Sequence, residues 1–248
     1  MKLAISGKGG VGKTILTALL AREAFRSGFK VLVVDADPDA NLASQLGFKE
    51  REITPLIEFK DLINERTGGG RLLKLNPKVD DIPDRFCLQK DGIKLLEMGT
   101  IRYGGNGCTC PENYFLKALL DHILLARDEL VLVDMEAGIE HLGRGTAQAM
   151  DALIVVVNPD KKSLETKKRI TALAAHLGIN NLYVIANKIR DSADKDMIST
   201  ELPTPPLGLI RYQDEVRKAS RDGLPVTAEN IENEIADIFD ELSRCLSL

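Results

Sequence analysis

The feature that most constrains the fold is a glycine-rich loop directly after a short apolar run at the N-terminus. Residues 7–14 read Gly-Lys-Gly-Gly-Val-Gly-Lys-Thr, and the apolar run Lys2–Ile5 precedes them. The string satisfies the pattern G-x-x-x-x-G-K-[ST], whose glycines let successive backbone N–H groups turn inward around a phosphate. Because this pattern needs a strand before it and a helix after it, the N-terminal segment is predicted to be strand, loop and helix.

Further short apolar runs recur along the chain, separated by stretches with helical periodicity. Runs without alternating polarity are typical of strands buried on both faces, so we predict an α/β fold with a mostly parallel central sheet flanked by helices on both faces. The predicted strands are Lys2–Ile5, Val31–Asp35, Leu130–Asp134, Ala152–Val157, Leu182–Ala186 and Leu207–Ile210. The clearest helical faces are Ile170, Leu173, Ala174 and Leu177, and Leu16, Leu19, Leu20 and Phe25.

One segment, from about residue 49 to 107, interrupts this alternation with glycine clusters and an Asn-Pro pair. Its apolar stretches, Leu72–Leu75 and Ile93–Met98, are long enough for short strands at most. A separate domain would need a larger core. We therefore expect a single domain over residues 1–248, with this segment as an insertion.

The composition narrows the classes of function. With 33 Lys and Arg against 37 Asp and Glu, the net charge of −4 offers no basic surface for nucleic acid. The longest apolar run, about Ala152–Val157, is far short of the roughly 18 to 20 residues of a membrane span. Four cysteines are too few for disulfides to stabilise a chain of this length, and no signal-peptide core precedes the glycine-rich loop. We expect a cytoplasmic protein with free thiols and neither nucleic-acid nor membrane partners.

The loop chemistry predicts binding of ATP or ADP with magnesium. Lys13 would neutralise the β- and γ-phosphates, and the Thr14 hydroxyl would ligate Mg²⁺. Asp134, at the end of a predicted strand, would hold a magnesium-bound water, with a helix cap as the alternative role. The predicted nucleotide contacts from this part of the chain are Gly7, Lys8, Gly9, Gly10, Val11, Gly12, Lys13, Thr14 and Ile15.

The identity of the base is predicted from a second motif. Asn187-Lys188-Ile189-Arg190 resembles the guanine-reading Asn-Lys-x-Asp of GTPases, but Arg190 replaces the aspartate. Without that carboxylate the guanine N1 and N2 donors lack a partner, which favours ATP. Asn187 and Lys188 are predicted base-side contacts. The loop containing Ile210, Arg211 and Tyr212 is expected to flank the ring.

The whole loop, with its second lysine Lys8, resembles the variant Walker A motif of dimeric P-loop ATPases that include the nitrogenase iron protein and the division-site and plasmid-partitioning (MinD and ParA) ATPases. That resemblance implies that Lys8 reaches the partner's nucleotide in a homodimer and that Asp37 is catalytic, orienting the attacking water and contributing to the magnesium site. It also implies switch roles for Asp39 and Gly138, while Asp35 anchors the site.

A Cys-x-Cys pair, Cys108 and Cys110, lies outside this shared machinery. In an extended segment both sulfurs project to one side, and a symmetric dimer would supply four, which suits Zn²⁺ or another thiophilic ion. Incidental or redox-active thiols are the alternatives. Cys87 and Cys245 are interpreted as small buried or surface residues without a chemical role. His141 is interpreted as a structural residue, with a metal ligand as the alternative.

The segments 104–113 and 134–141, together with the loop, resemble the CooC-type nickel-insertion ATPases that mature carbon monoxide dehydrogenase. This resemblance implies nickel, or zinc, bridging two subunits, ATP-driven dimer closure, and apo carbon monoxide dehydrogenase as the client. Arg211 departs from the family, in which a proline is expected. The rival functions are a MinD-like or ParA-like spatial regulator, which needs a cationic amphipathic tail, and an electron-transfer ATPase carrying an iron–sulfur cluster.

Overall fold

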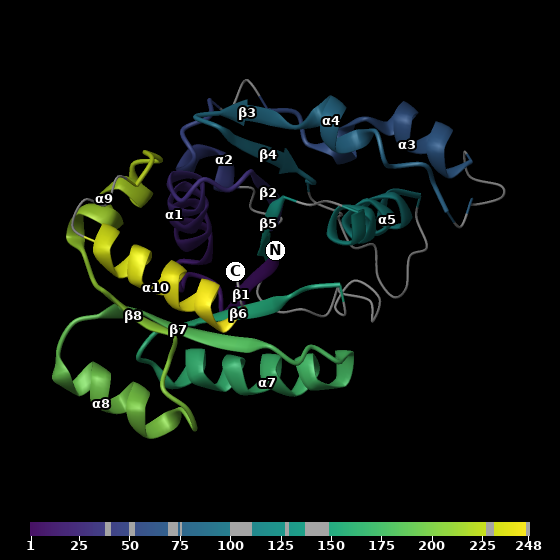
Figure 1. Cartoon of the computed structure of the whole chain (residues 1–248). Helices are drawn as coiled ribbons and strands as arrows, with labels where there is room; N and C mark the ends of the chain where they lie inside the picture. The colour runs from purple at the N-terminus through teal and green to yellow at the C-terminus, as the bar shows by residue number, and fades with distance from the viewer. Residues whose placement is uncertain are drawn as a thin grey trace.

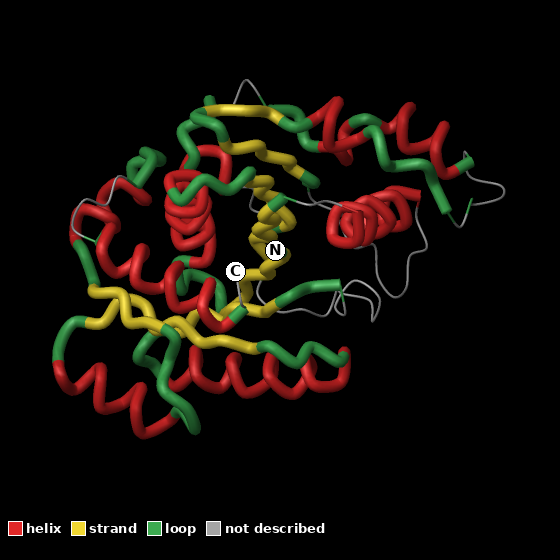
Figure 2. The backbone as a smooth tube through the Cα atoms, in the orientation of Figure 1, coloured by secondary structure: helices red, strands yellow, loops and turns green. Residues whose placement is uncertain are grey.

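The computed structural model describes residues 1–37, 41–49, 53–68, 74, 76–99, 111–126, 129–136, 149–226 and 231–246. In these ranges an eight-stranded sheet forms the centre of the molecule, with helices on both sides (Figures 1 and 2). In chain order the elements are β1 (Lys2–Gly7), α1 (Lys13–Arg26), β2 (Val31–Ala36), α2 (Leu42–Gln45), a 3-10 turn (Leu56–Glu58), α3 (Lys60–Thr67), α4 (Ile82–Phe86), β3 (Leu88–Lys90), β4 (Ile93–Glu97), α5 (Pro111–Ala126), β5 (Leu130–Met135), β6 (Ala152–Val157), α7 (Lys161–Leu177), β7 (Leu182–Ile189), α8 (Ser192–Glu201), β8 (Gly208–Arg211), α9 (Asp214–Arg221) and α10 (Glu232–Cys245).

The strand order is β3-β4-β2-β5-β1-β6-β7-β8. Among the described strands only the β3–β4 pairing is antiparallel. This arrangement confirms the predicted α/β fold with a mostly parallel sheet. Since parallel strands end at one edge, the carboxyl ends of β1, β2 and β5 lie together, and the functional residues after them are brought into one place.

Both faces of the sheet are buried, which explains why its strands read as uninterrupted apolar runs. Along β6, Leu153 and Val155 face one core, with α3, α4, α5, α7 and α8, whereas Ile154 and Val156 face the other, with α1, α2 and α10. Each core therefore uses alternate residues of the same strand.

The predicted face of α1 needs one correction. Leu16, Leu19 and Leu20 are buried, but Phe25 is 44% exposed. Phe25 comes five residues after Leu20, which rotates it about 140° away on a helix, while Ala24 takes the buried position. The Phe25 ring lies instead over Gly92, where a Cβ atom would come within 2.1 Å of it.

The segment predicted as an insertion contributes to the main sheet. Of the predicted stretch Ile93–Met98, Ile93–Glu97 forms β4, which pairs in parallel with β2, and β3 pairs with β4 as an edge hairpin. The turn between them, Asp91 and Gly92, has φ angles of 49° and 81°, as a two-residue hairpin turn requires. Apart from Lys74, the stretch Leu72–Leu75 lies outside the described residues.

The C-terminal helix α10 packs on the domain, as its apolar stripe predicts. Ile235, Ile238, Phe239 and Leu242 are buried in the core that also contains α1. Among the described helices, none is long and apolar enough to cross a membrane.

Candidate functional site

The glycine-rich loop joins β1 to α1 at the carboxyl edge of the sheet, in the expected strand–loop–helix context. Gly7 has a φ of 151°, and a Cβ there would lie 2.4 Å from the Val156 carbonyl oxygen. Gly12 has a φ of 100°, and a Cβ there would meet the Asn187 amide at 2.5 Å. Gly12 is also the N-cap of α1, with no side chain capping it. The first amides of α1 are therefore available to an anion.

A cavity of about 1020 Å³ opens beside this loop. It is lined by the loop and the start of α1 on one side and by the segments after β7 and β8 on the other. Lys13 lies in it, only 6% exposed, with its Nζ 3.7 Å from the Asp37 Oδ2. A buried ammonium facing a carboxylate is a charge arrangement that a phosphate group can take over.

Asp134 is the penultimate residue of β5 and lies close to the Thr14 hydroxyl. Its side chain is fully buried, and neither carboxylate oxygen makes a hydrogen bond of standard geometry with any described residue. Burial raises its pKa to about 7, opposed by the nearby Thr14 hydroxyl and Lys13. An unpaired carboxylate beside a threonine hydroxyl offers the oxygen ligands that Mg²⁺ prefers, so these residues fit a magnesium ion.

Asp35 lies opposite Asp134 in the pairing of β2 with β5. Its two oxygens accept hydrogen bonds from the backbone N–H groups of Asp37 and Leu42, each at 3.1 Å. Burial, reinforced by the charge of Asp134, raises the pKa of Asp35 to about 8. One carboxylate thereby anchors both ends of the loop that carries Asp37.

The second lysine of the loop is held within its own chain. The Nζ of Lys8 lies 3.3 Å from the Asp160 Oδ1. The same oxygen accepts a hydrogen bond at 2.8 Å from the backbone N–H of Ser163, so Asp160 is also the N-cap of α7.

Asn187 and Lys188 fasten β7 to the glycine-rich loop. The amide nitrogen of Asn187 donates to the Val11 carbonyl at 2.8 Å, and its oxygen accepts from the Lys188 N–H. Lys188 has a φ of 62° and donates from its Nζ to the Gly10 carbonyl at 2.6 Å. Both side chains also line the cavity. These contacts do not involve a base, and the part of Asn187 and Lys188 in binding one stays a prediction.

The other wall of the cavity is the end of β8 and the residues that follow it. Ile210 is buried, whereas Arg211 is largely exposed and pairs with Glu234 of α10. The guanidinium of Arg190 lies 4.7 Å from the ring centre of Tyr212, so the arginine that replaces the GTPase aspartate is stacked on an aromatic face.

The sequence prediction missed Asp160 and Glu234. Asp160 has an N-cap signature, since it is an aspartate immediately before the helical pattern of α7. Glu234 has no comparable signature, because its partner Arg211 lies in a different element and only the fold brings them together.

Four predicted site residues lie outside the described residues: Asp39, Gly138, Cys108 and Cys110. Their roles stay predictions. In the part of the chain that the structure describes, there is no cluster of three or more His, Cys, Asp or Glu side chains suited to a metal ion.

Comparisons with known proteins agree with this geometry. The model of the CobQ/CobB/MinD/ParA nucleotide binding domain matches residues 2–226. An ATP-binding protein of Methanocaldococcus jannaschii is 47% identical, covering 97% of this chain and 96% of its own. The carbon monoxide dehydrogenase accessory protein CooC of Rhodospirillum rubrum is 45% identical, covering 90% and 88%. The fold is similar to MinD in the MinC:MinD cell division complex of Aquifex aeolicus, with a TM-score of 0.72 and 23% identity over 98% and 95% of the chains.

Proposed function

Since the chain belongs to the CobQ/CobB/MinD/ParA nucleotide-binding domain family and is an ATPase, we propose that it uses ATP to load a metal into a client enzyme. The cargo is nickel, with zinc as an in vitro substitute, and the client is apo carbon monoxide dehydrogenase. The observation that carries this proposal is the 45% identity with CooC over 90% of the chain. Fold similarity alone would not distinguish it from other activities of the family.

In the proposed mechanism the glycine-rich loop and Lys13 bind the β- and γ-phosphates of ATP. Thr14, Asp134 and Asp37 hold Mg²⁺, which supplies charge neutralisation at the phosphates when bound. When the phosphates have replaced Asp37 as the partner of Lys13, the Asp37 carboxylate orients the attacking water. Asn187, Lys188, Ile210 and Arg211 surround the base.

The working unit is a homodimer. Lys8 of each subunit leaves Asp160 and reaches the nucleotide of the partner, where it stabilises charge on the transferring phosphoryl group. Asp39 and Gly138 act as the switch residues that sense the γ-phosphate. Cys108 and Cys110 of both subunits form one four-sulfur site in a reducing compartment, and closing the dimer assembles it.

The MinD-like alternative is supported by the shared fold but not by the C-terminal helix. A membrane-cycling regulator uses a cationic amphipathic tail with a free apolar face. Here the apolar residues Ile235, Ile238, Phe239 and Leu242 of α10 are buried in the core. The charge of the tail is also unsuitable, because acidic residues dominate residues 229–244.

Metal binding by the cysteine pair tests the proposal. Equilibrium dialysis with Ni²⁺ and with Zn²⁺, combined with the mass in solution, should give one ion per dimer for the wild type. The variant Cys108→Ser/Cys110→Ser should lose this ion and the metal-dependent dimer. The matched control is Cys87→Ser/Cys245→Ser, which changes the two other cysteines and should keep the ion.

Two results would contradict the shared site: unchanged metal binding by Cys108→Ser/Cys110→Ser, or one ion per monomer. Visible iron–sulfur absorbance of the purified protein, lost in the same variant, would instead support the electron-transfer alternative.

A further inference from the structure

The segment after β8 is fixed from both sides. β8 is the last strand of the described sheet, so no neighbouring strand pairs with its outer edge. On the inner side, the Tyr212 N–H donates to the Ile189 carbonyl of β7 at 2.9 Å. On the outer side, the Arg211 N–H donates to the Glu234 Oε2 of α10 at 3.1 Å. The Glu234 side chain of α10 thus provides the hydrogen-bond acceptor that a neighbouring strand would otherwise provide to the edge of β8.

Glu234 holds Arg211 through a second bond. Its Oε1 accepts from the Arg211 Nε at 2.5 Å, so one carboxylate fixes both the main chain and the side chain of the same residue. The Glu234 side chain is only 18% exposed, against 67% for Arg211. The acceptor is therefore the more closely packed side chain of the pair. Both bonds have an ionised acceptor, and such bonds are stronger than those between neutral groups.

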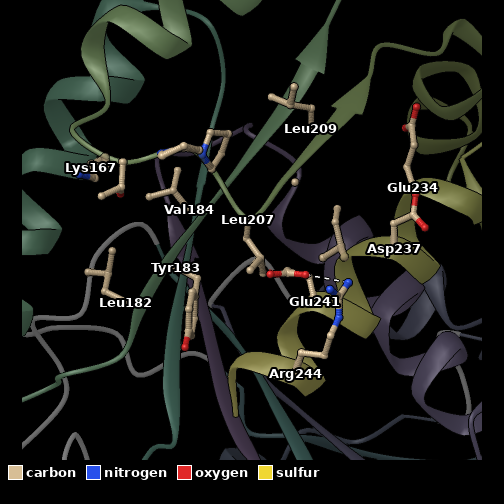
Figure 3. Close-up of a pocket in the computed structure, with 15 residues that line it drawn as sticks. Lys167, Leu182, Tyr183, Val184, Leu207, Leu209, Glu234, Asp237, Glu241 and Arg244 are labelled. Atoms are coloured by element: carbon tan, nitrogen blue, oxygen red, sulfur yellow. Dashed lines mark ion pairs between the residues drawn. The ribbon is translucent and has the colours of Figure 1, made fainter. Parts of the chain in front are cut away.

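The helix that carries Glu234 is itself immobilised against β8. A Cβ atom on Gly208 would lie 2.2 Å from Ile238, so strand and helix pack without room for a side chain. A groove of about 720 Å³ runs along this contact. Glu234 and Asp237 of α10 line it on one side, and Leu207 and Leu209 also line it (Figure 3). The position of Glu234 relative to the sheet is therefore set by close packing.

We propose that Glu234 is a positioning residue for recognition of the base. It fixes the segment 210–213, which lines the cavity opposite Asn187, and the inference rests on the proposed ATP site. Among the described residues, no hydrogen bond or ion pair links Glu234 to the phosphate loop. Glu234 should therefore act on the base half of the ligand and leave the phosphate half unchanged.

Isothermal titration calorimetry with two ligands tests this division. ADP engages both halves of the site, whereas inorganic triphosphate engages only the phosphate half. Glu234→Gln keeps the size of the side chain and loses its charge. Its Kd for ADP should rise about five- to tenfold, the size of the loss of one ordinary hydrogen bond, while its Kd for triphosphate stays within about twofold. The control is Glu232→Gln, which removes a carboxylate of the same helix that pairs with Arg26 and should change neither Kd.

Each outcome has a distinct meaning. An unchanged Kd for ADP in Glu234→Gln, or an equal rise for ADP and triphosphate, would overturn the positioning role. Failure of the wild type to bind ADP would instead overturn the proposed function. In the double variant Arg211→Ala/Glu234→Gln, the ADP effect should exceed that of Arg211→Ala, which keeps the main-chain bond to Glu234, but should be smaller than the sum of the two single effects, because both changes weaken the side-chain bond.

Discussion

Lys13 carries a charge in a place where water has little access. Its side chain is 6% exposed, and its Nζ lies 3.7 Å from Asp37, a distance that suits attraction but is too long for a hydrogen bond. The pair is therefore easily exchanged when a phosphate offers closer oxygens. Asp37 is held nearby through its own N–H by Asp35. In the proposed mechanism, the carboxylate that pairs with Lys13 in the single chain is thus released to orient the attacking water.

This arrangement gives the first residue-scale prediction. Asp37→Ala should bind ATP with an affinity close to that of the wild type, because Lys13 and the loop amides remain. Its turnover should fall by at least about 100-fold, the usual cost of losing a group that orients or activates the nucleophile. Phosphate release with saturating ATP and magnesium measures the turnover. Hydrolysis at the wild-type rate would exclude this role for Asp37.

Single residues differ in how well the sequence predicts them. Lys13, Thr14 and Asp134 follow from a local pattern, and the structure brings all three to one edge of the sheet. Asn187 was assigned only to the base, yet its amide also holds the glycine-rich loop through Val11. That contact joins residues 176 positions apart, so no local pattern could reveal it.

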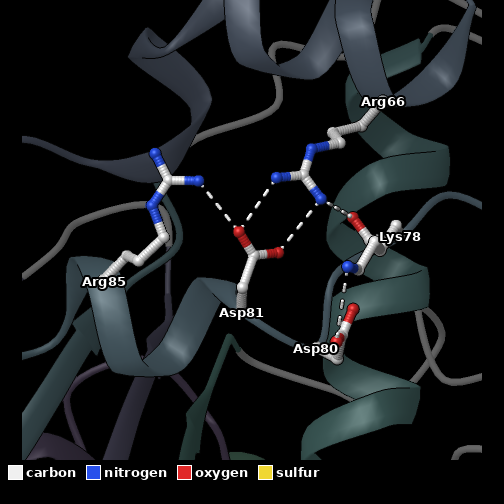
Figure 4. A network of polar contacts seen from close by, with 5 residues as sticks. All are labelled: Arg66, Lys78, Asp80, Asp81 and Arg85. Carbon is white, nitrogen blue, oxygen red and sulfur yellow. Dashed lines mark hydrogen bonds and ion pairs between the residues drawn. The ribbon is translucent and has the colours of Figure 1, made fainter.

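At the scale of elements, an ion-pair network joins α3 to α4. Arg66 donates to both oxygens of Asp81 at 3.0 and 2.9 Å and to the Lys78 carbonyl at 3.0 Å. Arg85 donates to the same carboxylate at 2.8 Å, so two guanidinium groups converge on Asp81 (Figure 4). Hydrogen bonds from both arginines hold the pKa of Asp81 well below its usual range.

Asp81→Asn should therefore lower the free energy of unfolding by about 1 kcal/mol at neutral pH, a value reduced by solvent screening. Because the folded-state pKa is depressed, the stabilisation is present above the ordinary pKa of an aspartate and is lost as the pH falls below about 4. The difference between wild type and variant should shrink accordingly on acidification. Urea unfolding at several pH values measures it.

Asp80→Asn is the matched control, since Asp80 is exposed and contacts only Lys78 at 3.9 Å among the ion pairs of the described residues. It should change stability by less than about 0.5 kcal/mol. An equal loss in both variants, or a difference that grows on acidification, would contradict a specific role for Asp81.

Elements were predicted best where the hydrophobic pattern is long. The buried strands β1, β2, β5 and β6 and the helices α7 and α10 follow from their apolar positions. The β3–β4 hairpin was not predicted, although Asp91 and Gly92 carry the local turn pattern, because β3 has only three residues. The end of β7 was placed too early, since a register irregularity lets the strand continue past Ala186 to Ile189.

At the scale of the whole molecule, Lys8 has one partner within the chain and, in the proposed dimer, another across the interface. Asp160→Asn removes the charge facing Lys8 but keeps the N-cap of α7, because asparagine accepts the same bond from Ser163. Releasing Lys8 should strengthen ATP-dependent dimerisation about two- to fivefold. Sedimentation equilibrium with ATP, in an Asp37→Ala background to prevent turnover, measures this.

Asp191→Asn provides the control, because Asp191 caps α8 in the same way by accepting from the Asp194 N–H. It has no described ion pair with the glycine-rich loop and should leave dimerisation unchanged. Weaker dimerisation of Asp160→Asn than of the control would show that the Lys8–Asp160 pair supports the dimer rather than competing with it.

The strand order also determines when β1 can pair with its neighbouring strands during synthesis of the chain. β1 is made before the other described strands of the sheet, yet its two neighbours, β5 and β6, consist of residues 130–135 and 152–157. The glycine-rich loop therefore has no sheet to support it until well over half of the chain has been made, because its strand pairs only with partners translated much later. A ribosome-bound chain that ends before Leu130 would carry the complete phosphate-binding motif without either neighbour of its strand. Nucleotide binding by the nascent protein is consequently expected only after residues 130–157 have been made, well after the motif itself.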